Sequence, residues 1–114
     1  FFLPKLIGFG KASALMMLGD KVSAEEAVSM GMIYKVENDE SLMEEAAKTA
    51  STLADMPTKG IWLTKKLLNE GTVNSLEIQL NREKEEQIAA ANSHDYKEGV
   101  NAFLEKRKPA FKGE

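Results

Sequence analysis

Apolar residues recur every three or four positions along most of the chain, the spacing that places side chains on one face of a helix. One such stretch contains the apolar residues Leu42, Met43, Ala46, Ala50 and Leu53. Glycine, proline, serine and asparagine separate these periodic stretches, as expected at helix ends. The pattern predicts short helices over residues 4–10, 11–18, 23–31, 39–57, 58–71, 74–92 and 93–109.

Local signals sharpen two of these boundaries. Ser23 with Glu26, and Asn74 with Glu77, have the spacing of a capping box, in which a side chain and a backbone amide at a helix start satisfy each other. Residues 32–36 alternate between apolar and polar, which is the period of a strand. We therefore predict an all-α chain of several short helices, with at most one short strand.

Composition narrows the class of protein. The chain has 114 residues, a formal net charge of -3 and a pI of about 5.3, which argues against nucleic acid or an anionic membrane surface as a partner. It contains no cysteine, which excludes disulfides and thiolate metal sites and fits a cytoplasmic protein. No apolar run approaches the roughly 20 residues of a membrane-spanning helix. We expect one small domain with no metal and no membrane partner.

The last predicted helix, residues 93–109, is the best specified. Ser93 can cap its first turn, and Asp95 and Glu98 lie where negative charge favours a helix start. Three basic residues lie near its end, where positive charge is favoured, and Pro109 stops it.

The apolar face of this helix has two interpretations. Periodicity alone, in a stripe that begins at Tyr96, favours Phe103 as a core residue and Lys106 as a surface cation at the helix end. Alternatively, an aromatic ring followed by basic side chains, with a second ring at Phe111, can hold a flat base and a phosphate.

Motifs along the whole chain resemble one family. Residues 95–111 match Asp-Tyr-x-Glu-Gly-Val-x-Ala-Phe-Leu-Glu-Lys-Arg-x-Pro-x-Phe, which resembles the C-terminus of the crotonase (enoyl-CoA hydratase/isomerase) superfamily. Residues 11–36, with the glycines and the Ser-Ala-x-Glu-Ala run, resemble a second stretch of these enzymes. Met-Pro-Thr-Lys-Gly at 56–60 and Leu-x-x-Gln-Leu-x-x-Glu at 76–83 resemble the branch that isomerises the ring epoxide of phenylacetyl-CoA.

The resemblance implies a place in a larger fold. Residues 1–114 correspond to the C-terminal helical region of an α/β crotonase-type spiral fold, a region that supports oligomerisation and contacts coenzyme A. The catalytic core is then absent from this chain and lies before Phe1. The apolar start, Phe1-Phe2-Leu3, also suggests a surface that packs against something outside the chain.

The resemblance also implies an activity. The complete enzyme is expected to stabilise a thioester enolate of an acyl-CoA substrate, to need no cofactor beyond the coenzyme A of that substrate, and to assemble as a trimer or hexamer. Isomerisation of the phenylacetyl-CoA ring epoxide is the first expectation, and hydration in fatty-acid oxidation is the alternative. A different class of protein, a free-standing helical interaction module without catalysis, fits the composition and the predicted helix starts and ends equally well.

Phe103 and Lys106 are the candidate coenzyme A-binding residues, because the family places a phenylalanine and a lysine at these matching positions near adenine and phosphates. If both lie on one helix face three residues apart, a ring and an ammonium group can act together. Gln87 stands where the family has a further phenylalanine on the preceding helix.

We assign no catalytic residue and no metal ligand to the chain. Its acidic residues lie at expected helix starts or in the polar run around residues 83–86. The lone histidine, His94, is expected to be a surface residue at a helix start, and Trp62 a core or interface anchor. The chain by itself is therefore expected to be inactive.

Overall fold

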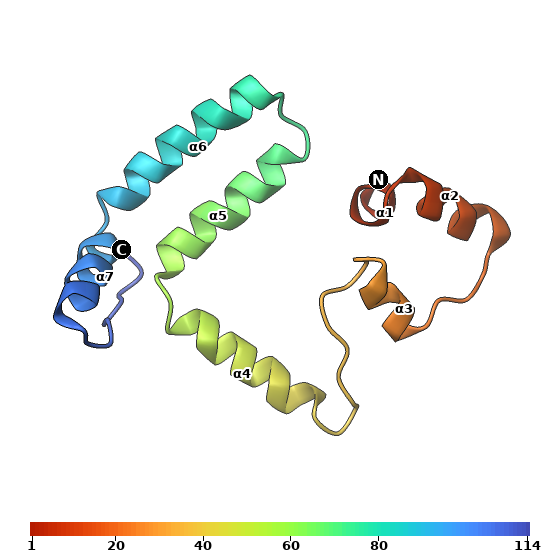
Figure 1. The fold of residues 1–114 in the computed structure, drawn as a ribbon, viewed down its shortest axis with the longest axis horizontal. Coiled ribbons are helices and arrows are strands. Elements are labelled where there is room, and N and C mark those ends of the chain that lie inside the picture. Colours follow the sequence, from red (N-terminus) through yellow and green to blue (C-terminus); the bar gives the residue numbers. More distant parts are fainter. The chain divides into compact units, whose positions relative to one another are not determined.

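The computed structural model describes all residues, 1–114, and it contains helices and no strand (Figure 1). The predicted all-α chain is confirmed. In chain order, the helices are α1 (Phe2–Ile7), α2 (Phe9–Leu18), α3 (Ala24–Ser29), α4 (Leu42–Ala54), α5 (Thr58–Gly71), α6 (Leu76–Ala91) and α7 (His94–Glu105).

The chain divides into two compact units, Phe1–Glu45 and Ala46–Glu114. In the first unit, α2 ends at Gly19, whose φ of 74° is a left-handed conformation that glycine adopts without strain. The predicted capping box of α3 is confirmed. The Ser23 hydroxyl accepts a bond from the Glu26 amide at 3.1 Å, and the Glu26 carboxylate accepts one from the Ser23 amide at 2.9 Å.

Residues 32–36 form no strand, although their alternation allowed one. The amides of Met32 and Ile33 donate to the carbonyl of Ala27, at 2.9 and 3.4 Å. These amides therefore close the C-terminal end of α3, where helix carbonyls need donors, and are not available to a neighbouring strand.

Two predicted helix starts are shifted along the chain. Before α4, the Asn38 carbonyl accepts from the amides of Ser41 and Leu42, so a turn precedes the helix. Before α6, the N-cap is Ser75, whose hydroxyl accepts from the Ile78 amide at 3.4 Å. Asn74, the cap predicted from sequence, was therefore wrong by one position.

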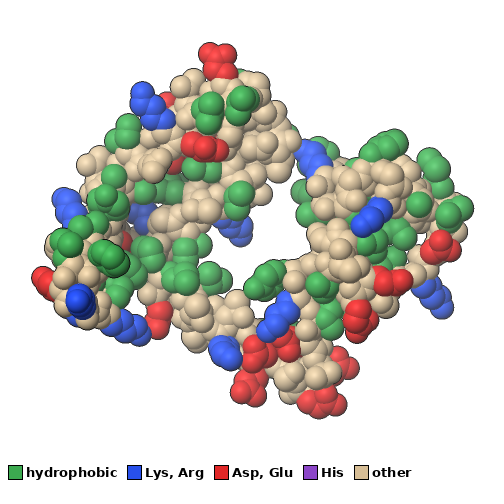
Figure 2. Space-filling view, viewed as in Figure 1, with side chains coloured by type: hydrophobic (Ala, Val, Ile, Leu, Met, Phe, Trp, Pro, Cys, Tyr) green, Lys and Arg blue, Asp and Glu red, His purple; other side chains and the backbone are tan.

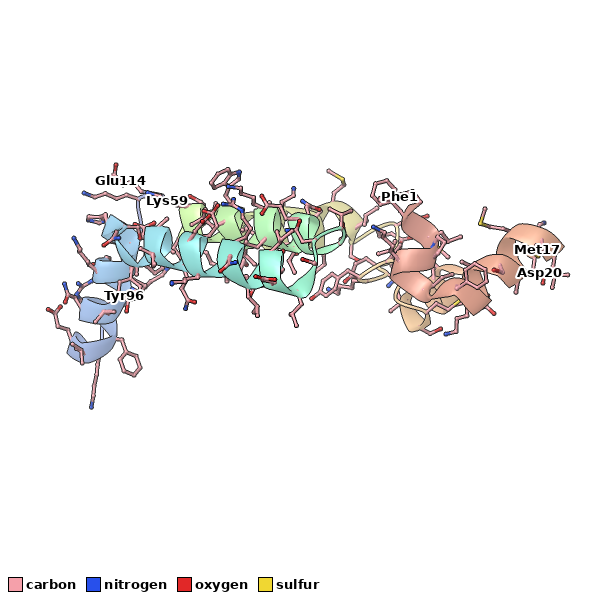
Figure 3. All side chains as sticks on the ribbon, turned by 90° about the horizontal axis from the view of Figure 1, so that it is seen from above. Phe1, Met17, Asp20, Lys59, Tyr96 and Glu114 are labelled. Atoms are coloured by element: carbon pink, nitrogen blue, oxygen red, sulfur yellow. The ribbon has the colours of Figure 1, made fainter.

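In the second unit, α5 and α6 lie side by side (Figures 1 and 3). Polar contacts cross between them: the Lys66 ammonium lies 2.6 Å from the Glu86 carboxylate, and the Arg82 guanidinium 3.1 Å from that of Glu70. The Lys66 hydrogen bond is the main reason why the pKa of Glu86 lies below its ordinary value. Ion pairs thus help to hold α5 against α6, beside the buried Leu63.

The buried interior is small. The buried hydrophobic residues are Ile7, Ala12, Ala27, Leu63 and Ala102. Many large apolar side chains are exposed in both units (Figure 2). None of the helices combines the length and the apolar character that crossing a membrane requires. An apolar surface of this extent normally packs against other protein.

Candidate functional site

An open groove of about 440 Å³ lies along α7 in the second unit, within the size range of small-molecule sites, roughly 300–1,000 Å³. Its walls come from the start of α5, the end of α6, one face of α7 and a ring beyond α7. Most of its surface is apolar. The lining residues are Pro57, Gly60, Ala90, Ser93, Asp95, Tyr96, Gly99, Val100, Phe103, Leu104 and Phe111.

The start of α7 forms as predicted. Ser93 is the N-cap, and its hydroxyl accepts a hydrogen bond from the Tyr96 amide at 3.0 Å. Ala102, one of the most buried residues, fixes the other end of the helix. The helix therefore presents its groove face from a firmly defined position.

Residues 109–114, here named the C-terminal tail, fold back along α7 instead of extending away (Figure 1). Asp95, whose exposed fraction is only 2%, accepts hydrogen bonds from the amides of Lys112 at 2.7 Å and Gly113 at 2.8 Å. In return, the Asp95 amide donates to the Glu114 carbonyl at 3.0 Å. Asp95 thus joins the start of α7 to the end of the C-terminal tail.

Burial acts to raise the pKa of Asp95, but the amides of Lys112 and Gly113 and the neighbouring His94 outweigh it, so the pKa lies below its ordinary value. An ionised carboxylate is stable at this site for two reasons. Hydrogen-bond donors of the protein replace the lost water, and the positive end of the α7 helix dipole stabilises the negative charge.

Glu98 holds the tail one turn further along. Its carboxylate accepts two bonds from the Arg107 guanidinium, at 2.6 and 2.9 Å, and a third from the Ala110 amide at 2.8 Å. The Arg107 side chain, followed by the Ala110 amide, lowers the pKa of Glu98 to about 2. We name Asp95, Glu98 and the groups that they bind the carboxylate clasp.

Two contacts show how closely the tail fits. A methyl group on Gly99 would lie 3.5 Å from the Phe111 ring, so that ring rests directly on the α7 backbone. Gly113 has a φ of 81°, and a Cβ there would lie 2.5 Å from the Thr58 hydroxyl oxygen at the start of α5. Figure 3 labels Glu114 and Lys59 beside one another at this end of α5. The tail is therefore part of the groove wall.

Phe103 is exposed, with an accessible fraction of 82%, and lines the groove. The interpretation of Phe103 as a core residue was therefore wrong in this structure. Periodicity identified the apolar face of α7 correctly, but that face borders the groove, and Tyr96 and Leu104 on it are also exposed.

Lys106 does not continue the helix. It has a φ of 54°, its amide donates to the Phe103 carbonyl at 3.2 Å, and the Arg107 amide donates to the Ala102 carbonyl at 3.0 Å. This bond pair is the Schellman turn that closes a helix, and Lys106 occupies the position usually taken by glycine. The argument that Phe103 and Lys106 share a helix face was therefore wrong, because α7 ends at Glu105.

The other residues singled out by sequence lie apart from this arrangement. Gln87 lines a second groove, of about 720 Å³, between α5 and α6. Trp62 is exposed on α5, with the Lys66 ammonium 5.4 Å from its ring centre. His94 is partly exposed at the start of α7, with its Nδ1 3.3 Å from the Asp95 carboxylate. The structure contains no cluster of three or more acidic or histidine side chains that could hold a metal ion.

The carboxylate clasp was missed by sequence reasoning, which treated Asp95 and Glu98 only as favourable charges near a helix start. The available signals were Pro109, which cannot continue a helix, and Gly113, which permits a left-handed conformation. Together they allow a reversal of the chain, but they do not say which side chains receive it.

Comparison with known proteins gives one family over the full chain. The family described as enoyl-CoA hydratase/isomerase matches residues 1–114. The 1,2-epoxyphenylacetyl-CoA isomerase of Escherichia coli is 43% identical over 113 residues, covering 99% of this chain and 43% of that protein. A probable enoyl-CoA hydratase of Rhodobacter capsulatus is 35% identical over 113 residues, covering 99% of this chain and 44% of the relative.

A solved structure agrees. The crystal structure of an enoyl-CoA hydratase from Geobacillus kaustophilus superposes with a TM-score of 0.94 at 31% identity, over 98% of this chain and 42% of that one. The chain thus spans less than half the length of these relatives.

The carboxylate clasp should open in acid. A carboxyl group whose folded pKa is lowered stabilises the fold above its unfolded pKa, and this contribution is lost as the pH falls through the folded value. For Glu98 the window runs from its ordinary 4.5 down to about 2. The amide proton shifts of Ala110, Lys112 and Gly113, followed by NMR, should move together with protonation of these carboxyls.

Glu98→Gln is the control for this titration. It should remove the transition at Ala110 and leave those at Lys112 and Gly113, because the latter two amides bind Asp95. An Ala110 amide shift that stays constant across the window, or that titrates around the ordinary glutamate pKa of 4.5, would contradict the clasp.

Proposed function

The chain belongs to the enoyl-CoA hydratase/isomerase family, and on that premise we propose that it is the C-terminal helical part of an enzyme that acts on acyl-CoA thioesters. The observation that carries this proposal is the family match over residues 1–114, at 43% identity to an isomerase of an acyl-CoA epoxide. The relatives are more than twice as long, so the complete protein is expected to contain further segments.

The finer proposal is isomerisation of the phenylacetyl-CoA ring epoxide. It rests on the identity to the Escherichia coli isomerase and on the two short motifs at 56–60 and 76–83. The alternative is hydration of an enoyl-CoA. A crotonyl-CoA hydratase of Syntrophomonas wolfei is 34% identical over 109 residues, which keeps that reaction as the second candidate.

The proposed chemistry passes through a thioester enolate, whose oxygen needs hydrogen-bond donors and whose carbon needs a placed carboxylate. The acidic groups described above are used in other ways. Asp95 and Glu98 bind the tail, and Glu70 and Glu86 bind across α5 and α6. This supports the proposal that the reacting groups lie outside residues 1–114.

For this chain itself, we propose contact with the coenzyme A part of the substrate through Phe103 and Lys106. Phe103 offers an exposed ring at an apolar groove, and Lys106 offers an exposed ammonium three residues later. A ring can stack on adenine, and an ammonium group can bind a phosphate. Coenzyme A is part of the substrate here, so no separate cofactor is proposed.

We also propose that the complete protein assembles as a homo-oligomer, a trimer or hexamer. The exposed apolar side chains of both units provide surface that copies of the protein, or its remaining segments, can bury. A complete protein that stays monomeric at micromolar concentration would contradict this proposal.

The reaction is decided by an assay of the complete protein with two substrates, crotonyl-CoA and the ring epoxide of phenylacetyl-CoA. We expect turnover of the epoxide to exceed hydration of crotonyl-CoA in kcat/KM. The opposite order would favour the hydratase. Absence of turnover with either thioester, in a folded protein, would contradict both.

The coenzyme A contact is tested by Lys106→Gly in the complete protein. Glycine suits the left-handed turn better than lysine does, so the free energy of unfolding should not fall. Affinity for coenzyme A should fall by about 1–2 kcal/mol, the size of a lost charge-assisted contact. The loss should shrink at high salt, because an exposed ammonium–phosphate pair is screened.

Lys108→Gly is the matched control. Lys108 lies two residues after Lys106 and its side chain is also exposed, so this variant removes the same charge from a neighbouring position. It should change the affinity much less. If Lys106→Gly leaves binding of coenzyme A and of dephospho-coenzyme A unchanged while the fold is intact, Lys106 is only a helix-end cation and this site assignment is wrong.

A further inference from the structure

Lys106 holds a backbone conformation that a lysine does not favour. It is the one residue other than glycine with a positive φ in the chain, at 54°. Its Cβ crowds the backbone in this conformation, which is why glycine is usual at this position of a helix end. A strained non-glycine residue persists only where its surroundings hold it. The groups around Lys106 must therefore hold this turn.

Groups on both sides of Lys106 hold the turn. On the helix side, the Arg107 amide donates to the Ala102 carbonyl at 3.0 Å, and Ala102 is buried. On the tail side, Glu98 binds the Arg107 guanidinium with both carboxylate oxygens and the Ala110 amide with one. Glu98 thereby connects the body of α7 with residues on the far side of Lys106.

The Glu98–Arg107 pair has the geometry of a positioning contact. A bidentate carboxylate–guanidinium pair fixes orientation as well as distance, unlike a single ion pair. Glu98 is largely shielded, with a side-chain exposed fraction of 15%, while that of Arg107 is 41%. The pair therefore holds Arg107 in one direction and leaves the adjacent Lys106 side chain in solvent.

We infer that Glu98 and Arg107 are positioning residues for the substrate: they hold the strained turn so that the Lys106 ammonium is already placed for a coenzyme A phosphate. This inference rests on the proposed function of Lys106. Without the clasp, the turn must be ordered when the ligand binds, and that ordering reduces affinity. The expected signature is weaker binding with unchanged chemistry.

The test uses Glu98→Gln in the complete protein. Glutamine keeps the size and one acceptor oxygen but loses the charge and the two-oxygen grip on Arg107. Affinity for coenzyme A should weaken about twofold to tenfold, the effect of ordering one long side chain on binding. KM for the acyl-CoA substrate should rise by a similar factor, while kcat stays the same.

Glu105→Gln is the matched control. Glu105 also binds Arg107, at 2.6 Å, but its side chain is 62% exposed and its carboxylate binds no group of the tail. This variant removes the same charge from the same arginine without touching the tail. It should leave KM and coenzyme A affinity nearly unchanged, and an effect equal to that of Glu98→Gln would overturn the inference.

A double-mutant cycle decides whether Glu98 acts through Lys106. In the Lys106→Gly background, Glu98→Gln should cause no further loss of affinity, because the side chain that it positions is gone. A full additional loss in the double variant would overturn the positioning role and show a general effect on the fold.

Arg107→Lys covers the case in which Glu98→Gln fails to fold, since it keeps the positive charge but lacks the two-pronged guanidinium. It should also raise KM without changing kcat; unchanged KM in this folded variant would overturn the inference.

The failure of one proposal can be told apart from the failure of the other. If Lys106→Gly alone does not change the affinity for coenzyme A, both the assignment of the coenzyme A site and the positioning role of Glu98 and Arg107 are wrong. If Lys106→Gly weakens binding but Glu98→Gln does not, only the positioning role falls.

Discussion

A carboxylate that is shielded from water must find donors within the protein, and this requirement governs the C-terminal half of the structure. Asp95 is almost fully buried, and the donors that it finds are the amides of Lys112 and Gly113. The Glu98 carboxylate accepts its hydrogen bonds from the Arg107 guanidinium and the Ala110 amide. The path of the tail follows from these bonds, and the tail in turn supplies one wall of the groove along α7.

The consequences extend from the tail to the candidate site. Since the tail returns along α7, Phe111 rests against the helix at Gly99 and lines the same groove as Phe103. The chain must also reverse between the end of α7 and the tail, and Lys106 takes the left-handed position at the start of that reversal. The two residues proposed to contact coenzyme A therefore stand at the end of one helix, beside a tail that two acidic side chains bind.

The sequence predicted helix caps and helix ends better than it predicted contacts between distant residues. Caps and breakers act over three or four residues, so the capping box at Ser23 and the stop of α2 at Gly19 could be predicted. The start of α6 was displaced because Asn74 and Ser75 are both good caps, and in the structure the Asn74 side chain instead donates to that of Gln79 at 3.0 Å. The carboxylates of the clasp bind amides up to 18 positions away, and no periodicity reports such a pairing.

Phe103 shows a second limit of pattern reasoning. Helical periodicity tells which side chains share a face, but it does not tell whether that face meets a core, a groove or another chain. In this structure the face borders a groove. The exposed apolar side chains belong to a chain that spans less than half the length of the relatives it matches.

The most direct test of this account is a crystal structure of the complete protein with a coenzyme A thioester bound. The account predicts the Phe103 ring against the adenine, the Lys106 ammonium within hydrogen-bond distance of a phosphate, and the tail held by Asp95 and Glu98 as described here. A thioester bound with its adenine and phosphates away from α7, or Phe103 and Lys106 buried against protein and out of reach of any ligand, would contradict it.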